Sequence, residues 1–319
     1  MLYTFRYTFV ADHYQYLASI GPIALVSAGL AKLTDSIRYG PRFLSALGIL
    51  IFGALGLLTW RQSASYRDSE TLWRTTIDRN PGCWMAENNL GSELLETSGD
   101  VEGAIAHFEK SLRLKFDHPA THDNVTYALL RKGDPDAAIA EAHVALNLQP
   151  NNANTHVVLG MALMTKGLMD EAMAQFSRAL EIRPKYSDAH YNLAVALAEK
   201  HETVDAIAHY EKAIEVQPDF FWALTNLAWI FASSSDAAIR NGPRVVELAE
   251  EANRLTGGTS PLVLRTLAAA YATNKSFDKA LETCRRALQS AQAARDSELA
   301  EEIRREMAFY EAGLPYRAP

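Results

Sequence analysis

Apolar and small residues recur along this chain with a period of 34 residues between about Trp84 and Leu288. Four alanines show the register: Ala104, Ala138, Ala172 and Ala206. A mostly aromatic position follows four residues later, a small residue seven residues later, and in three of the four copies a proline twelve residues later. This spacing predicts pairs of short helices, because small side chains let helix axes approach and proline ends a helix. One pair cannot bury its apolar stripe alone, so we expect the pairs to stack.

The pattern resembles that of the tetratricopeptide repeat family. The stretch Leu159–Pro184, LGMALMTKGLMDEAMAQFSRALEIRP, is close to the family consensus. The resemblance covers roughly two thirds of the chain and implies an all-α fold, in which repeated helix pairs form a right-handed superhelix with a capping helix at the end.

The register divides the repeat array, residues 63–295, into units. We expect a half unit at 63–81, full units at about 84–117, 118–151, 152–185, 186–219, 220–258 and 260–293, and a capping helix with a tail at 296–319. The first unit has one extra residue in its internal turn, and SSSDAAIRNGP at 233–243 interrupts the fifth.

Residues 1–62 have a different pattern, with uncharged apolar runs at Tyr16–Ala31 and Phe43–Trp60. A membrane-spanning helix needs about 20 mostly apolar residues. We therefore predict two transmembrane helices at about 16–33 and 43–60, with buried core helices as the alternative. Small residues in the second run, Gly48, Gly53 and Gly56, would allow close contact with further membrane-spanning subunits.

The side of the membrane that carries the repeats stays open on charge alone. Three basic residues at 32–42 favour a cytoplasmic connector and extracytoplasmic repeats, whereas three arginines at 61–74 favour the reverse. The stretch Phe9–Gly21, FVADHYQYLASIG, followed by two spans and then repeats, resembles the end of the membrane domain in transmembrane O-mannosyltransferases that carry tetratricopeptide repeats. That resemblance implies an integral membrane protein with periplasmic or lumenal repeats. It brings no catalytic residue, because the acidic motif of those enzymes lies far upstream of this region.

The net charge of −7 is unevenly distributed. Residues 1–60 carry four Lys/Arg and two Asp/Glu, a net +2, and the remainder carries a net −9. An acidic repeat region argues against nucleic acid as a partner, because phosphates require a basic surface. The two cysteines, Cys83 and Cys284, lie at opposite ends of the array, so a disulfide between them is not expected.

Catalytic and metal-binding motifs are missing from the sequence, and no cofactor is expected. His122, His156 and His190 recur at one repeat position. Ligands of one zinc ion lie about 2.0–2.3 Å from it, whereas packed helix axes are about 8–10 Å apart, so these three histidines cannot share a metal. His107 and His209 form a second column, expected on an outer helix face.

Asparagine recurs just before the apolar anchor of the first helix in four units, and aromatic residues stand about one turn away. The candidate peptide-binding residues are Asn89, Asn124, Asn192, Asn226, Tyr127, Tyr191, Trp222 and Trp229. A side-chain amide both donates and accepts, so it can bond the backbone of an extended peptide whatever its sequence. The column is similar to the asparagine ladder of repeat proteins of the O-GlcNAc transferase type. Local helix packing is the alternative role.

Together these features predict a membrane-anchored scaffold, not itself an enzyme, that binds a peptide segment or partner protein in its concave groove. The alternative is the C-terminal part of a membrane glycosyltransferase of protein O-glycosylation, in which the repeats present the acceptor protein.

Overall fold

The computed structural model describes residues 50, 53–54, 57, 68–240 and 242–317. The chain divides into two compact units, Met1–Leu72 and Trp73–Pro319, of which the second is described below. The membrane spans expected at 16–33 and 43–60 lie outside the described residues, apart from four isolated positions. In the part of the chain that is described, no helix is long and apolar enough to cross a membrane.

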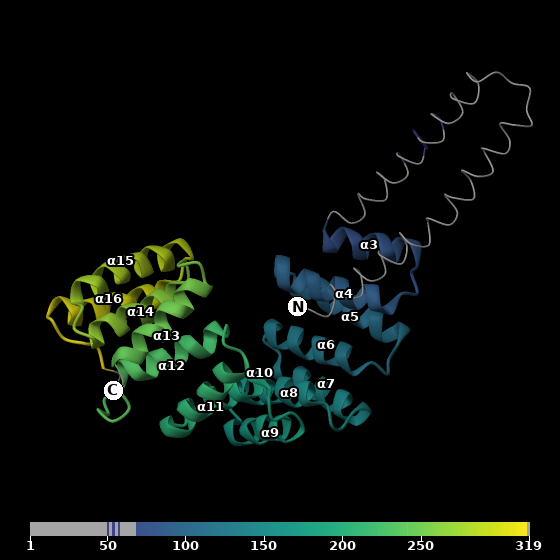
Figure 1. Ribbon diagram of the computed structural model, residues 1–319. Coiled ribbons are helices and arrows are strands. Elements are labelled where there is room, and N and C mark those ends of the chain that lie inside the picture. The colour runs from purple at the N-terminus through teal and green to yellow at the C-terminus, as the bar shows by residue number, and fades with distance from the viewer. Residues whose placement is uncertain (1–49, 51–52, 55–56, 58–67, 241, 318–319) are drawn as a thin grey trace, which may run out of the picture. The chain divides into compact units, whose positions relative to one another are not determined.

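The second unit is a stack of helix pairs (Figure 1). The described elements are α3 (Ser69–Arg79), which contains the boundary between the units, and α4 (Trp84–Glu93), η2 (Leu94–Ser98), α5 (Val101–Leu114), α6 (Pro119–Lys132), α7 (Pro135–Leu148), α8 (Ala153–Thr165), α9 (Met169–Ile182), α10 (Ser187–Glu199), α11 (Thr203–Val216), α12 (Phe221–Ser233), α13 (Gly242–Leu255), α14 (Pro261–Thr273), α15 (Phe277–Ala293) and α16 (Ser297–Glu311). The predicted all-α repeat fold is confirmed.

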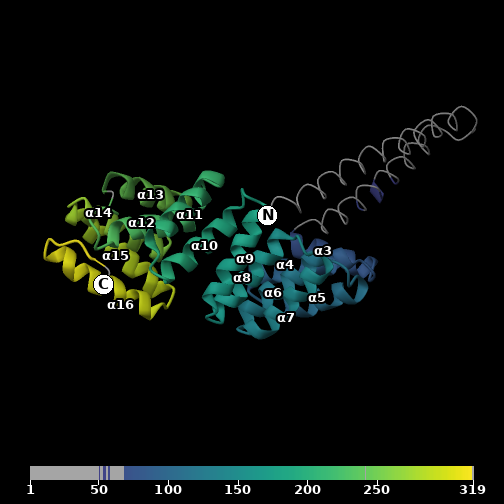
Figure 2. The ribbon, with the colours of Figure 1, turned by 90° about the horizontal axis from the view of Figure 1, so that it is seen from below.

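The first and second helices of the pairs form two layers (Figures 1 and 2). First helices contact one another, as α6 does with α8 and α12 with α14. Each second helix packs mainly between its own first helix and the next one, as α11 does between α10 and α12. We call the side of the first helices that the second helices leave uncovered the inner face.

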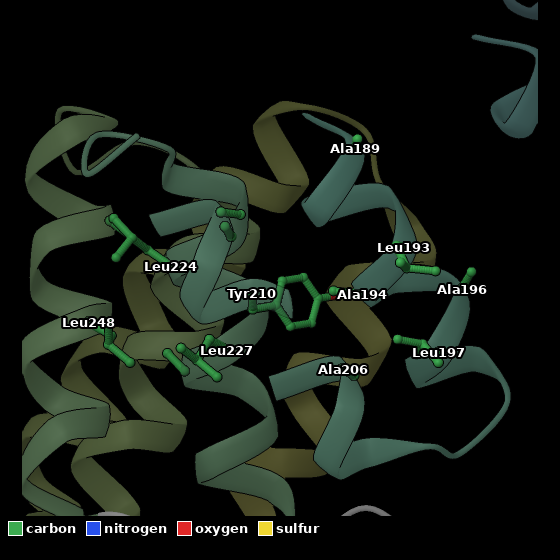
Figure 3. Packing of buried hydrophobic residues seen from close by; sticks show 14 of the residues in the cluster. Ala189, Leu193, Ala194, Ala196, Leu197, Ala206, Tyr210, Leu224, Leu227 and Leu248 are labelled. Carbon is green, nitrogen blue, oxygen red and sulfur yellow. The ribbon is translucent and has the colours of Figure 1, made fainter. Parts of the chain in front are cut away.

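The residues that carry the 34-residue period make the core. The four alanines Ala104, Ala138, Ala172 and Ala206 have no exposed surface, so the backbones of neighbouring helices meet there. The aromatic residue four positions later fills the space beside them, as Tyr210 does next to Ala206 and Ala194 (Figure 3). Small and large positions thus alternate to give dense packing.

The turn inside the first unit contains one extra residue, and the structure accommodates it as the π-helical turn η2 at the end of α4. A π-bulge adds one residue to a helix without breaking it, so the following helix α5 keeps its register. Asp100 caps the N-terminus of α5, because its side chain accepts a hydrogen bond from the backbone N–H of Gly103 at 2.9 Å.

The interruption in the fifth unit is a loop between α12 and α13. Arg240 holds this loop, because its Nη1 donates to the carbonyls of Ser234 at 3.3 Å and Ser235 at 3.0 Å. After the sixth pair, α16 covers the end of the stack with Ile303 and Tyr310, which are buried against α14 and α15.

Candidate functional site

The eight predicted peptide-binding residues all lie on first helices. Tyr127 and Trp222 are the exposed ones, at 39% and 42% of their surface. Asn192 is buried, and the other five are half-buried. The aromatic side chains therefore differ in what they offer to a ligand.

The asparagine amides use their N–H groups inside the protein. Asn124 donates to Asn88 Oδ1 at 3.0 Å, and so links α6 to α4. Asn192 donates to the carbonyl of Asp188 at 2.8 Å, on its own helix. Asn226 donates to the hydroxyl of Tyr210 at 3.2 Å, and more weakly to Tyr191 at 3.4 Å.

The Oδ1 atoms of these asparagines, unlike most of their amide nitrogens, have few hydrogen-bond partners among the described residues. Asn89 Oδ1 accepts from Asn88 at 3.3 Å, whereas no described residue donates to Oδ1 of Asn124, Asn192 or Asn226. Each of these three amides is thus held by its nitrogen with its oxygen unpaired, a geometry that suits an acceptor for a peptide N–H.

Tyr191 and Trp229 already have aromatic partners. The Tyr191 ring lies 5.0 Å from Phe220 and 5.9 Å from Tyr210 between centroids, and burial raises the pKa of Tyr191. Trp229 lies 4.2 Å below the Arg265 guanidinium, and 6.1 Å from the ring of Tyr316. These two residues are therefore partly covered within the protein.

Further inner-face residues connect consecutive first helices, and the sequence reasoning missed them. Asn154 donates to Asp123 Oδ2 at 2.8 Å and joins α8 to α6. The Tyr186 hydroxyl donates to Asn154 Oδ1 at 2.8 Å, and the Arg183 guanidinium lies 4.4 Å over the Tyr186 ring. Asp123 and Asn154 are polar residues in the first two turns of their helices but are not one repeated residue type, and Arg183 and Tyr186 lie between α9 and α10.

The Asp123 carboxyl is almost fully buried, at 3% exposure. Burial raises its pKa, although hydrogen bonds from Asn154 and Thr155 act in the opposite direction. Burial also raises the pKa of Tyr186, to about 12. Burial thus favours the neutral forms of the Asp123 carboxyl and the Tyr186 hydroxyl, which suits a joint between helices.

The recurrent histidines form pairs inside units. The first-helix residue meets a second-helix residue, with Glu87 next to His107 at 2.5 Å, His122 next to Glu141 at 2.5 Å, His156 next to Gln175 at 2.8 Å and His190 next to His209 at 3.0 Å. His107 and His209 thus face the first helices, and the expectation that they lie on an outer face was wrong. A repeated position in the sequence does not show which neighbour its side chain meets.

Hydrogen-bond partners assign the protonation of these histidines. His122 Nε2 lies 2.8 Å from the Phe116 carbonyl, and His190 Nε2 lies 3.1 Å from the Pro184 carbonyl. A carbonyl only accepts, so Nε2 carries a proton in both. His122 must then donate a second proton to Glu141, whereas His190 accepts at Nδ1 from His209.

The His190–His209 pair borders an open hollow of ≈ 500 Å³ that Lys185, Lys212 and Glu215 also line. The two lysines weigh against a metal cation. No group of three or more possible metal ligands exists among the described residues. The pair is best described as a neutral hydrogen-bonded joint between α10 and α11.

Comparisons with known proteins support the repeat assignment. Tetratricopeptide repeat families match residues 54–118 and 187–220, and a TPR repeat family matches residues 160–200. Protein O-mannosyl-transferase Tmtc2 of Drosophila melanogaster is 33% identical over 115 residues, which are 36% of this chain and 12% of that protein. Tmtc1 of the same organism is 30% identical over 115 residues, 35% of this chain and 13% of that protein. The chain spans about an eighth of the length of these relatives.

Solved structures show the same fold at low sequence identity. The Cut9–Hcn1 hetero-tetramer of APC/C superposes with a TM-score of 0.64 at 16% identity, covering 74% of this chain and 45% of that chain. Pseudomonas aeruginosa pilF gives 0.57 at 18% identity, covering 72% of this chain and 99% of that chain. Together with the sequence matches, these folds establish that this chain contains tetratricopeptide repeats.

Proposed function

We propose that this protein is a membrane-anchored scaffold that binds an extended segment of a partner protein on its inner face. The observation that carries the proposal is the set of unpaired asparagine oxygens on Asn124, Asn192 and Asn226, each on an amide fixed through its nitrogen. A fixed acceptor costs little entropy when a ligand binds. Such oxygens accept main-chain N–H groups without selecting a sequence, and the exposed rings of Tyr127 and Trp222 add apolar contacts beside them.

The test is a selection of displayed random peptides on the full chain, followed by affinity measurements on variants. Asn192→Ala is the informative change, because the Asn192 amide bonds only its own helix and its loss breaks no contact between helices. Losing one hydrogen bond of about 0.5–1.5 kcal/mol should weaken binding several-fold. Asn147→Ala, an exposed asparagine on the second helix α7, is the matched control. Selected peptides that bind both variants as tightly as the wild type would contradict the proposal.

Membrane anchoring through residues 1–62 is part of the same proposal and is supported by the two uncharged runs in the sequence. We infer that the repeats lie on the periplasmic or lumenal side. Protease protection of sealed vesicles of known sidedness, with a tag after Pro319, tests both statements. A tag digested only from the extracytoplasmic side agrees with the proposal. Release of the protein by alkaline washing would rule out the anchor.

A second candidate is a part in protein O-glycosylation, favoured by the similarity to the O-mannosyl-transferases Tmtc1 and Tmtc2 over about a third of this chain. In that case the repeats hold an acceptor protein close to a catalytic membrane domain. The test is to purify the full chain, together with any membrane proteins bound to it, from detergent-solubilised membranes. The preparation is then assayed for mannosyl transfer to a selected peptide. Transfer that depends on Asn192 would support this role, and a preparation with no transfer activity would favour the scaffold alone.

A further inference from the structure

The segment after α16 folds back onto the inner face of the fifth and sixth units. Arg317 Nη1 donates to the carbonyl of Ala232, and to Thr273 Oγ1 at 3.4 Å. The Tyr316 ring lies 6.1 Å from Trp229 and 5.6 Å from Phe309 between centroids. Tyr316 and Arg317 thus contact residues of α12 and α14 that lie 44 to 87 positions earlier in the chain.

The contact places a cation at two helix ends. α12 ends at Ser233 and α14 ends at Thr273. The last carbonyls of a helix have no partner inside it and carry partial negative charge, so a guanidinium is favoured there. The Thr273 hydroxyl also donates to the Ala232 carbonyl at 3.1 Å. The site is therefore a built receptor for a guanidinium, with an aromatic surface, Trp229, beside it.

The occupant is held weakly. No described carboxylate pairs with Arg317, and burial and the nearby Arg240 lower the pKa of Arg317. Leu314 is 56% exposed, and Pro315, Tyr316 and Arg317 are each half-buried. A segment with the same two side chains could replace it without any change in the helices beneath.

We propose that Leu314–Arg317 is an internal ligand that covers a docking surface made by Trp229, Ala232 and Thr273, and that the partner for this surface is an extended peptide with an aromatic residue followed by arginine. The proposal rests on the inner face being a peptide-binding surface. It adds the chemistry that the fifth and sixth units recognise, and a competitor within the chain that must be displaced first.

The experiment uses a fluorescent peptide of the sequence AGLPYR, which corresponds to residues 312–317, and measures its anisotropy with the full chain. Emptying the surface with Tyr316→Ala plus Arg317→Ala should tighten binding about tenfold relative to the wild type if the internal segment is bound nine-tenths of the time. Adding Trp229→Leu to this variant should abolish binding. Adding Val204→Ala instead, at an exposed apolar residue of the second helix α11, is the control and should leave binding unchanged. Equal affinity for the wild type and the emptied variant, or no binding to either, would overturn the proposal.

A second measurement leaves the surface intact. Tyr316→Cys in a Cys83→Ser background is labelled with bimane, whose emission tryptophan quenches at contact. Added AGLPYR should restore the emission, and a further Trp229→Phe change should remove the quenching from the start. Bimane emission that is the same with Trp229 and with Trp229→Phe would show that the segment does not lie on this surface. Quenching that rises with protein concentration would show that the segment binds the surface of a second copy of the chain, and would overturn the proposal that it is an internal ligand.

These outcomes are separable from those of the proposed function. Peptides selected at Asn192 test the fourth unit. They can bind whether or not Leu314–Arg317 covers the fifth and sixth.

Discussion

At the residue scale, the paired histidines predict opposite effects of pH on stability. Burial disfavours the His122 cation, but the bonds to Glu141 and Phe116 outweigh it and raise the His122 pKa above its ordinary 6.5. The stability from this pair is fully present below pH 6.5 and is lost as the pH rises through the folded pKa. Glu141→Gln should therefore be most destabilising near pH 6, with a cost that shrinks towards pH 8.5. Urea unfolding at a series of pH values measures it, and a constant cost would contradict the ion pair.

His190 and His209 should behave in the reverse way. Burial lowers the pKa of each, and the Lys212 charge adds to this. The unfolded chain then binds protons more readily, so these groups reduce stability as the pH falls below 6.5. His209→Gln reproduces the His156–Gln175 pair of the third unit. The variant should gain stability relative to the wild type at pH 5, with little difference at pH 8. A difference that does not change with pH would rule out the neutral pair.

Gly160 illustrates a second restriction at this scale, set by an aromatic neighbour. A Cβ added there would lie 2.4 Å from Cε1 of Phe176. Gly160→Ala should therefore cost about 1–3 kcal/mol through overpacking, despite a gain of about 1 kcal/mol in helix propensity. In a Phe176→Ala background, which matches Ala142 of the second unit, the same change should become stabilising. Thermal unfolding of the four proteins gives the coupling, and additive effects would contradict the contact.

At the element scale, the turn between the two helices of a unit needs a left-handed residue. Gly133 and Gly167 supply it with φ of 85° and 81°, whereas Lys275 adopts φ of 60° in the sixth unit. A residue with a side chain is strained by about 1–2 kcal/mol in this region. Replacing it with glycine relieves the strain, but the larger conformational entropy of glycine in the unfolded chain offsets part of the gain. Lys275→Gly should therefore raise stability by about 0.5–1 kcal/mol. A melting temperature that falls would show that the Lys275 side chain has another role.

The elements also show what a sequence pattern can and cannot give. The period of 34 predicted the all-α stack because the alanines, aromatics and prolines each act within one unit or between neighbours. The asparagine column was visible too, but its hydrogen bonds were not, since Asn226 bonds tyrosines 16 and 35 positions away. The contact of the segment Leu314–Arg317 with Trp229 could not be predicted from the sequence, because a repeat pattern does not specify where an irregular segment packs.

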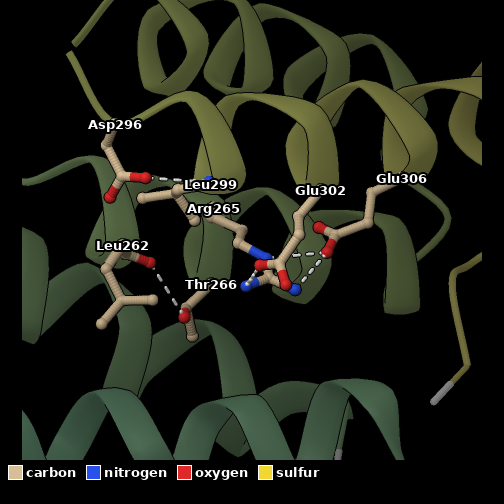
Figure 4. A network of polar contacts seen from close by, with 7 residues as sticks. All are labelled: Leu262, Arg265, Thr266, Asp296, Leu299, Glu302 and Glu306. Carbon is tan, nitrogen blue, oxygen red and sulfur yellow. Dashed lines mark hydrogen bonds and ion pairs between the residues drawn. The ribbon is translucent and has the colours of Figure 1, made fainter. Parts of the chain in front are cut away.

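At the scale of the whole molecule, an array of neighbour contacts depends on its ends, and here a buried ion pair adds to the apolar packing between the last unit and its capping helix. Arg265 on α14 pairs with Glu306 and Glu302 of α16, both at 2.6 Å (Figure 4). Glu306 is 1% exposed, and burial raises its pKa. Removing the guanidinium would leave this carboxylate buried without a cation.

Arg265→Leu should therefore lower the free energy of unfolding by about 3–5 kcal/mol at neutral pH. Replacing its partners Glu302 and Glu306 with leucine as well should recover most of this loss. The cost of the single change should shrink as the pH falls, because Glu306 then takes up a proton. Since each unit contacts only its neighbours, the loss should appear in hydrogen exchange as faster opening of α15 and α16, with α6 to α9 unchanged. Uniformly faster exchange along the array would instead show that the stack unfolds as one cooperative block, in which the cap stabilises even the distant first units.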